Sequence, residues 1–169
     1  SAQRMDVYLP ARLTKPAPVV FFVHGGAWVA GDKRQDKYLV TKASHWLEQG
    51  FIFISTNHRL LPAADPLSQV DDVARALAHA QHQAASWGGD ASRFILVGYS
   101  AGGHLVSMLS ADPARAFRVG AKPWLGMVGL DIAGLDLPAI MQQRHFAYYD
   151  KAFGNDKTYW QAASPLAAL

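Results

Sequence analysis

The sequence contains no cysteine, which excludes disulfide bonds, thiolate nucleophiles and cysteine-ligated zinc or iron–sulfur sites. The compartment stays undecided, because such a chain tolerates either redox environment; we expect the cytoplasm, although a signal peptide removed before Ser1 would leave no trace. No apolar run approaches the ~18 residues of a membrane span. No run of lysine and arginine reaches four residues, and the net charge is only +3. We therefore expect no membrane span and no nucleic-acid partner.

What the chain does contain is typical of one compact α/β domain over all 169 residues, half of which are apolar. Three short apolar runs do not alternate with polar residues, a pattern that predicts strands buried on both faces: Val19–Val23, Phe51–Ser55 and Phe94–Gly98. Further strands are expected at Met5–Leu9 and Trp124–Ile132.

The segments between these strands predict helices at Gln35–Gln49, Pro66–Gly89 and Ser100–Ser110. Ser68, followed three residues later by Asp71, resembles a capping box for the second helix, and Gly88–Gly89 a stop. Strands and helices alternate, so we expect an α/β three-layer sandwich with a mostly parallel sheet.

One motif carries nucleophilic chemistry. Gly98-Tyr99-Ser100-Ala101-Gly102 matches G-x-S-x-G and lies between a predicted strand and a predicted helix. A serine in such a tight turn needs very small residues two positions before and after it, and Gly98 and Gly102 provide them. The alternative interpretation is a glycine-rich turn with an incidental serine.

A second motif, His24-Gly25-Gly26-Ala27-Trp28, follows the strand Val19–Val23. Its glycines allow successive backbone N–H groups to point at one oxygen, and together with the N–H of Ala101 they predict an oxyanion hole. An ordinary turn with a capping histidine is the alternative. Neither glycine cluster spells the G-x-G-x-x-G of dinucleotide binding, and we expect no cofactor and no metal.

With these motifs the chain resembles the α/β-hydrolase-fold carboxylesterases that carry HGG-x-W and G-x-SAGGH, a group that includes hormone-sensitive-lipase-like and kynurenine-formamidase-like enzymes. The resemblance runs from about Met5 to Leu169. The matching segments are HGGAW (24–28), GDK (31–33), NHRL (57–60), GGDASRF (88–94) and GYSAGGH (98–104). His58 departs from the pattern, because relatives often have tyrosine there, which we interpret as a packing variation.

The resemblance implies that Ser100 is the nucleophile. It also implies oxyanion donors at Gly26, Ala27 and Ala101. His24 would orient the loop and Trp28 would pack behind it, with Gly25, Gly98 and Gly102 in supporting positions. The implied substrates are small acyl or aryl esters, with arylformamidase activity on an N-formyl amide as an alternative.

The base and the acid that such a serine needs are harder to assign. Relatives continue past the position of Ala163–Leu166 into strands that carry them, so we expect both to be missing here. Asp136 and His145 have the right order and form a less favoured internal pair. His104 is expected to be a buried structural residue, and His79 and His82 to face solvent rather than a metal.

Two questions stay open in the sequence. A parallel sheet that stops after the strand candidate Trp124–Ile132 has an unpaired edge, which predicts a homo-oligomer, a complementing C-terminal fragment, or a chain that is a piece of a longer protein. A non-catalytic binding domain is the competing hypothesis. Six aromatic residues near the end of the chain could line a substrate pocket or form core: Phe146, Tyr148, Tyr149, Phe153, Tyr159 and Trp160.

Overall fold

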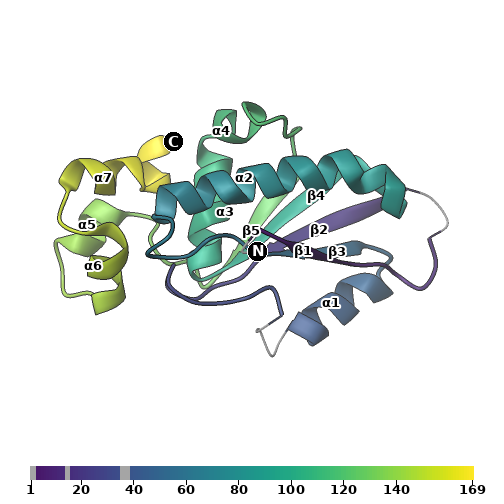
Figure 1. Cartoon of the computed structure of the whole chain (residues 1–169), viewed down its shortest axis with the longest axis horizontal. Coiled ribbons are helices and arrows are strands. Elements are labelled where there is room, and N and C mark those ends of the chain that lie inside the picture. The colour runs from purple at the N-terminus through teal and green to yellow at the C-terminus, as the bar shows by residue number, and fades with distance from the viewer. Residues whose placement is uncertain (1–2, 14–15, 35–38) are drawn as a thin grey trace.

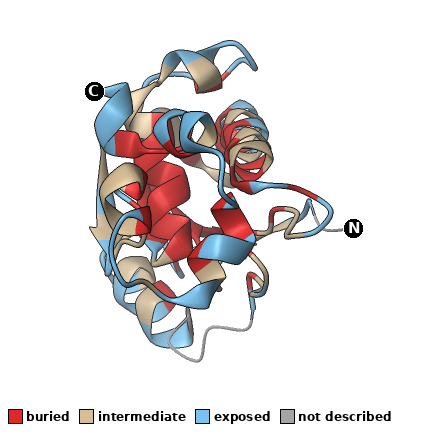
Figure 2. Ribbon diagram, turned by 90° about the vertical axis from the view of Figure 1, so that its left-hand side faces the viewer, coloured by how far each residue is buried: buried red, intermediate tan, exposed pale blue. Residues whose placement is uncertain are grey.

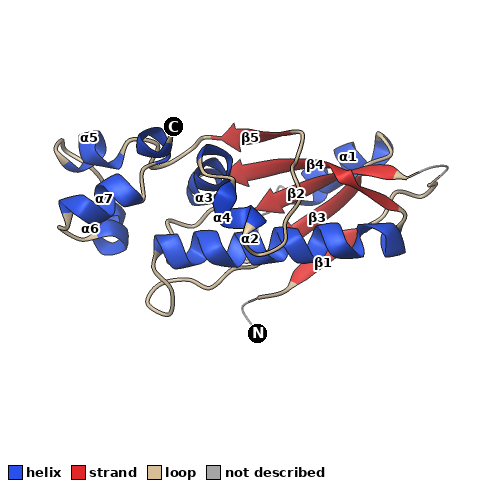
Figure 3. Ribbon diagram, turned by 90° about the horizontal axis from the view of Figure 1, so that it is seen from above, coloured by secondary structure: helices blue, strands red, loops and turns tan. Residues whose placement is uncertain are grey.

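The computed structural model describes residues 3–13, 16–34 and 39–169, and shows a five-stranded sheet with helices on both faces (Figures 1 and 3). The strands lie in the order β1-β3-β2-β4-β5. β1 is antiparallel to β3, and the other pairs are parallel. Their bounds are β1 Met5–Tyr8, β2 Ala17–Val23, β3 Ile52–Thr56, β4 Gly89–Tyr99 and β5 Gly126–Leu130. The predicted α/β sandwich with a mostly parallel sheet is thus confirmed.

The two faces of β2 explain the three layers. Val19, Phe21 and Val23 are buried in one cluster with side chains of α2 and α3. Val20 and Phe22 lie in a second cluster, which includes residues of α1. Because successive side chains of a strand point to opposite faces, a continuous apolar run is what a strand covered on both sides requires. In Figure 2 the buried parts of the ribbon, drawn in red, gather at the centre of the molecule.

Three larger helices cover the sheet: α1 Leu39–Glu48 on one face, α2 Pro66–Gln83 and α3 Ala101–Ala111 on the other (Figure 1). The start of the predicted first helix, 35–38, lies outside the described residues. α2 ends earlier than predicted: a 3-10 turn, Ala84–Trp87, follows it, and the left-handed Gly88 stops that turn so that Gly89 already belongs to β4.

The predicted capping box of α2 is wrong. Asp65 caps this helix by accepting a hydrogen bond from the Ser68 amide at 2.8 Å. Asp71 instead forms an ion pair with Arg115 at 2.9 Å. The reason is Pro66, which suits the first helical turn because it lacks an N–H that would otherwise need a partner, so the helix begins ahead of Ser68.

The last third of the chain forms short helices, most of which group at one end of the sheet (Figures 1 and 3). They are α4 Ala114–Phe117, α5 Leu137–Met141, α6 Ala147–Phe153, α7 Lys157–Ala162 and a 3-10 turn, Pro165–Ala168. Of the aromatic residues expected either to line a pocket or to form core, Tyr149, Phe153 and Trp160 are buried and belong to the core. Phe146 is 69% exposed. No helix of the described residues has the length and apolar character for crossing a membrane.

Candidate active site

Ser100 stands at the sharp turn between β4 and α3. Its backbone has φ 51° and ψ −117°, a conformation that L residues rarely adopt and that costs roughly 1–3 kcal/mol. The turn is held because the Ser100 amide donates to the Leu130 carbonyl at 2.9 Å, while the Ser100 carbonyl accepts from the His104 amide at 3.2 Å. The predicted helix therefore starts one residue later, at Ala101, and its N-terminus faces the serine.

The glycines around this turn allow the backbones to pack without side chains between them. A Cβ added to Gly98 would collide with the carbonyl of Gly102, and one added to Gly102 would collide with the carbonyls of Val23 and His24. The N-terminus of α3 thus lies directly against the end of β2. This contact brings the two sequence motifs together.

The loop after β2 runs across the serine. A Cβ on Gly25 would lie 3.1 Å from the Cβ of Ser100 and 2.9 Å from the carbonyl oxygen of Tyr99. Gly26, Ala27 and Trp28 all have positive φ, at 132°, 51° and 62°. The loop therefore turns in a left-handed arc beside the nucleophile candidate.

Three amides of this region have no protein acceptor. In the part of the chain that the structure describes, the backbone N–H groups of Gly26, Ala27 and Ala101 donate to no other protein group. Backbone amides that have no protein acceptor and lie near a strained serine are available to a developing negative charge.

His24 and Trp28 flank the loop. The imidazole of His24 donates from Nδ1 to the Gly25 carbonyl at 2.8 Å and stacks on His58, with 4.7 Å between ring centroids. Burial, together with neighbouring His24, lowers the pKa of His58 to about 4. Trp28 is 1% exposed and packs behind the loop, where it contacts aromatic residues of α6.

The internal candidates for a general base are engaged elsewhere. Nε2 of His145 lies 3.0 Å from the Asp150 carboxylate, and Asp136 caps α5 through the Ala139 amide at 3.1 Å. Nε2 of His104 donates to the Ala163 carbonyl at 2.7 Å. Across the described ranges no hydrogen bond reaches the Ser100 hydroxyl. His79 and His82 are exposed, as predicted.

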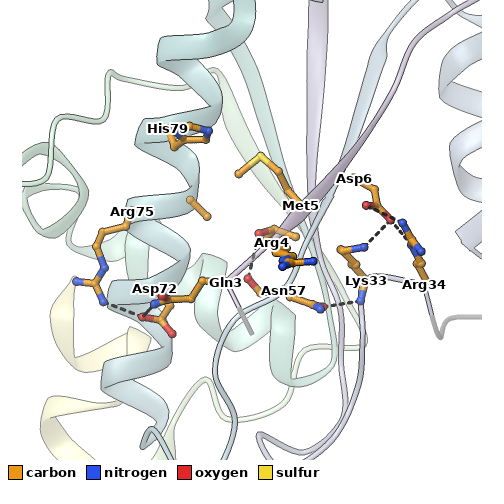
Figure 4. A pocket seen from close by; sticks show the side chains of 12 residues that line it. Gln3, Arg4, Met5, Asp6, Lys33, Arg34, Asn57, Asp72, Arg75 and His79 are labelled. Atoms are coloured by element: carbon orange, nitrogen blue, oxygen red, sulfur yellow. Dashed lines mark hydrogen bonds and ion pairs between the residues drawn. The ribbon is translucent and has the colours of Figure 1, made fainter. Parts of the chain in front are cut away.

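A pocket of about 560 Å³ lies elsewhere, in a groove between β1 and α2 (Figure 4). Its walls carry charged side chains that largely pair with one another: Lys33 and Arg34 with Asp6, and Arg75 with Asp72. No residue of the loop 24–28 or of the turn 98–102 lines it. This groove is distinct from the candidate active site.

The sheet order, the strained serine between a strand and a helix, and the glycine loop beside it define an α/β-hydrolase fold. The chain belongs to the BD-FAE family, whose model matches residues 5–118.

Similar proteins agree with this assignment. The chain is 38% identical over 108 residues to esterase LipC of Mycobacterium tuberculosis, and 32% identical over 111 residues to isoprenylcysteine alpha-carbonyl methylesterase ICME of Arabidopsis thaliana. These alignments cover 63% and 66% of this chain. The chain spans only 26% and 25% of those two relatives.

Solved structures share the fold over nearly the whole chain. A phosphonate-inhibited esterase B from Lactobacillus rhamnosis superposes with a TM-score of 0.75 and 24% identity, over 95% of this chain and 54% of the other. A bifunctional GH43-CE protein from Bacteroides eggerthii gives a TM-score of 0.81 and 21% identity, over 98% and 24% respectively. At these identities the likeness shows the fold alone.

Proposed function

We propose that this chain forms the nucleophile-bearing part of a serine carboxylesterase that cleaves small acyl or aryl esters. The single observation that carries the proposal is that the Gly25 backbone lies so close to Ser100 that a Cβ added to Gly25 would be 3.1 Å from the Cβ of Ser100, with positive φ at both positions 26 and 100. Membership of the BD-FAE family and the names of the relatives, which are esterases, support the same activity.

In this mechanism the Ser100 hydroxyl oxygen attacks the ester carbonyl carbon, and the carbonyl oxygen becomes an anion. The amides of Gly26, Ala27 and Ala101 hydrogen-bond that oxygen, and each such donor contributes about 2.7–4 kcal/mol to stabilisation of the transition state. The N-terminus of α3 adds a favourable dipole. When the tetrahedral intermediate collapses, its bond to the alcohol oxygen breaks, and the alcohol leaves with the proton that the base took from Ser100. Water then attacks the acyl-enzyme, which releases the carboxylic acid and restores the Ser100 hydroxyl.

Deprotonation of Ser100 requires a base, and none of the described histidines hydrogen-bonds it. We propose that a histidine and an acid from polypeptide outside these 169 residues complete the triad, either as a further segment of the same protein or as a separate chain.

The outer edge of β5 supports such docking. This strand contains no charge and no proline, whereas the opposite edge strand carries Asp6, paired with Lys33 and Arg34. Leu125, Val128 and Leu130 beside the β5 edge are 64%, 45% and 37% exposed. A bare apolar edge is a template for another strand. A second copy of the chain could also dock there.

Hydrolysis of p-nitrophenyl acetate by the whole protein, compared with its Ser100→Ala variant, tests the proposal. We expect activity to fall by at least about 10³-fold in the variant, and a fluorophosphonate probe to label the unmodified protein only. A formanilide assayed beside the ester distinguishes an arylformamidase from an esterase. If the whole protein neither hydrolyses these substrates nor reacts with the probe, it is a binding domain of the same fold.

A further inference from the structure

His104 makes one hydrogen bond from each ring nitrogen. It lies on α3, four residues after Ser100, and its side chain has no exposed surface. Nδ1 accepts from the indole Nε1–H of Trp28 at 3.2 Å, and Nε2 lies 2.7 Å from the Ala163 carbonyl. Because an indole N–H can only donate and a carbonyl can only accept, these partners fix the neutral Nε2–H tautomer.

Trp28, which donates to His104, is the last residue of the loop 24–28 that passes Ser100. Trp28 and the preceding Ala27 have φ values of 62° and 51°, and non-glycine residues keep such values only where surrounding contacts enforce them. The main chain of Trp28 is held as well: its carbonyl accepts from the Gln69 side chain at 2.9 Å and from the Leu61 amide at 3.0 Å. The indole is held separately, by its hydrogen bond to His104 and by its packing on aromatic residues of α6.

We propose that His104 is a positioning residue that holds Trp28. Through Trp28 it keeps the amides of Gly26 and Ala27 within hydrogen-bonding distance of the oxyanion that forms when Ser100 attacks the substrate. The inference rests on the proposed function above. His104 and Ala101 belong to the same helix, so the Trp28 bond ties the loop amides to the helix amide that faces the same oxygen. A site of this kind loses about 10²-fold in rate when its donors move by an ångström.

Two replacements of His104 separate its two hydrogen bonds. In His104→Asn the amide oxygen occupies the place of Nδ1 and still accepts from Trp28, but the side chain is too short for Ala163. In His104→Gln the longer side chain still donates to Ala163 but leaves the indole without its acceptor. Trp28→Phe removes the indole donor while an aromatic ring remains packed on Phe153.

Ester hydrolysis by the whole protein provides one measurement. We expect His104→Gln and Trp28→Phe to lower kcat about 10- to 100-fold with KM nearly unchanged, because the oxyanion donors act in the transition state. His104→Asn should keep kcat within about threefold of the unmodified protein. The double variant that combines His104→Gln with Trp28→Phe should be no slower than the slower of these two single variants, because both remove the same hydrogen bond.

Amide hydrogen exchange at Val29 and Ala30, whose N–H groups donate to the Gly26 carbonyl at 3.1 and 2.9 Å, provides a second measurement, which needs no activity. Exchange should be faster in His104→Gln and Trp28→Phe than in His104→Asn. The inference is overturned if Asn and Gln at position 104 behave alike in exchange, or if the losses in the double variant add. If Ser100→Ala shows that the protein has no esterase activity, the proposed function fails, and the exchange comparison still decides whether His104 orders the loop.

Discussion

The carboxylate of Asp72 accepts two hydrogen bonds from the guanidinium of Arg59, each at 2.8 Å. Asp72 also accepts from the Arg59 amide, from Gln3 and from Arg75. Burial by itself would raise the pKa of Asp72, but these donors hold it well below its ordinary value. The carboxylate therefore ties α2 to the segment after β3.

Asp72→Asn should lower the free energy of unfolding by roughly 2–3 kcal/mol, because Arg59 and Arg75 lose a buried anionic partner. Urea denaturation measures the loss. The neighbouring Asp71 is the matched control: it pairs with Arg115 but its side chain is 44% exposed, so Asp71→Asn should cost under about 1 kcal/mol. Equal losses in the two variants would contradict the assigned role of Asp72.

Gly25→Ala should lower kcat/KM for a small ester about 10²-fold, because the new methyl group must push the loop away from Ser100 and Tyr99. Steady-state kinetics measures the effect, and thermal unfolding checks that the variant folds. Gly126→Ala is the control, since no atom lies within 4 Å of a Cβ added there. Unchanged kinetics in Gly25→Ala would argue against the loop as an oxyanion site.

Stability should fall as the pH drops from about 6.5 to about 4. Burial lowers the pKa of both His58 and His104 to about 4, below the ordinary value of 6.5 for histidine. The unfolded chain therefore binds more protons than the folded one in this interval, and each imidazole removes roughly 1.4 kcal/mol per pH unit. The stabilising contribution is complete above pH 6.5.

Denaturation midpoints across that interval measure the slope. His58→Tyr, which removes one of the two groups, should roughly halve it. His82→Gln, at an exposed position, should leave it unchanged. A flat stability profile in the unmodified protein would show that neither imidazole is held neutral by burial.

A lysine at the outer edge of the sheet should block docking on β5. Val128→Lys should weaken self-association, or binding of a complementing segment, at least about tenfold. Sedimentation velocity or co-expression with the complementing segment measures the change. Val40→Lys, on the far helix α1 and 74% exposed, serves as the control. The β5 proposal fails if both variants associate alike.

The sequence predicted the sheet and the site motifs because their signals are local. Continuous apolar runs such as Val19–Val23 have few solutions other than doubly buried strands, and the glycines around Ser100 are required by close backbone contacts. The start of α2 at Pro66 was predicted correctly, but its capping residues were not, because Asp65 and Ser68 both carry side chains that can cap a helix and Pro66 decides between them through its position in the first turn.

Other features depend on contacts that no local pattern encodes. The hydrogen bond between Trp28 and His104 joins residues 76 positions apart. The burial of Phe153 likewise follows from its packing on Trp28, since the short helices after Leu130 have no clear periodicity. The pairing of β1 with β3 also depends on distant residues, because Met5 lies opposite Thr56.

The backbone conformation at residue 100 lowers the stability of the fold, whereas the serine that adopts it is needed for the proposed activity. A glycine adopts φ 51° with ψ −117° without the penalty that serine carries, so Ser100→Gly would produce a more heat-resistant and inactive molecule. Directed evolution of this protein for thermal tolerance would therefore select against the serine that we propose as its nucleophile, unless every round also screened for turnover.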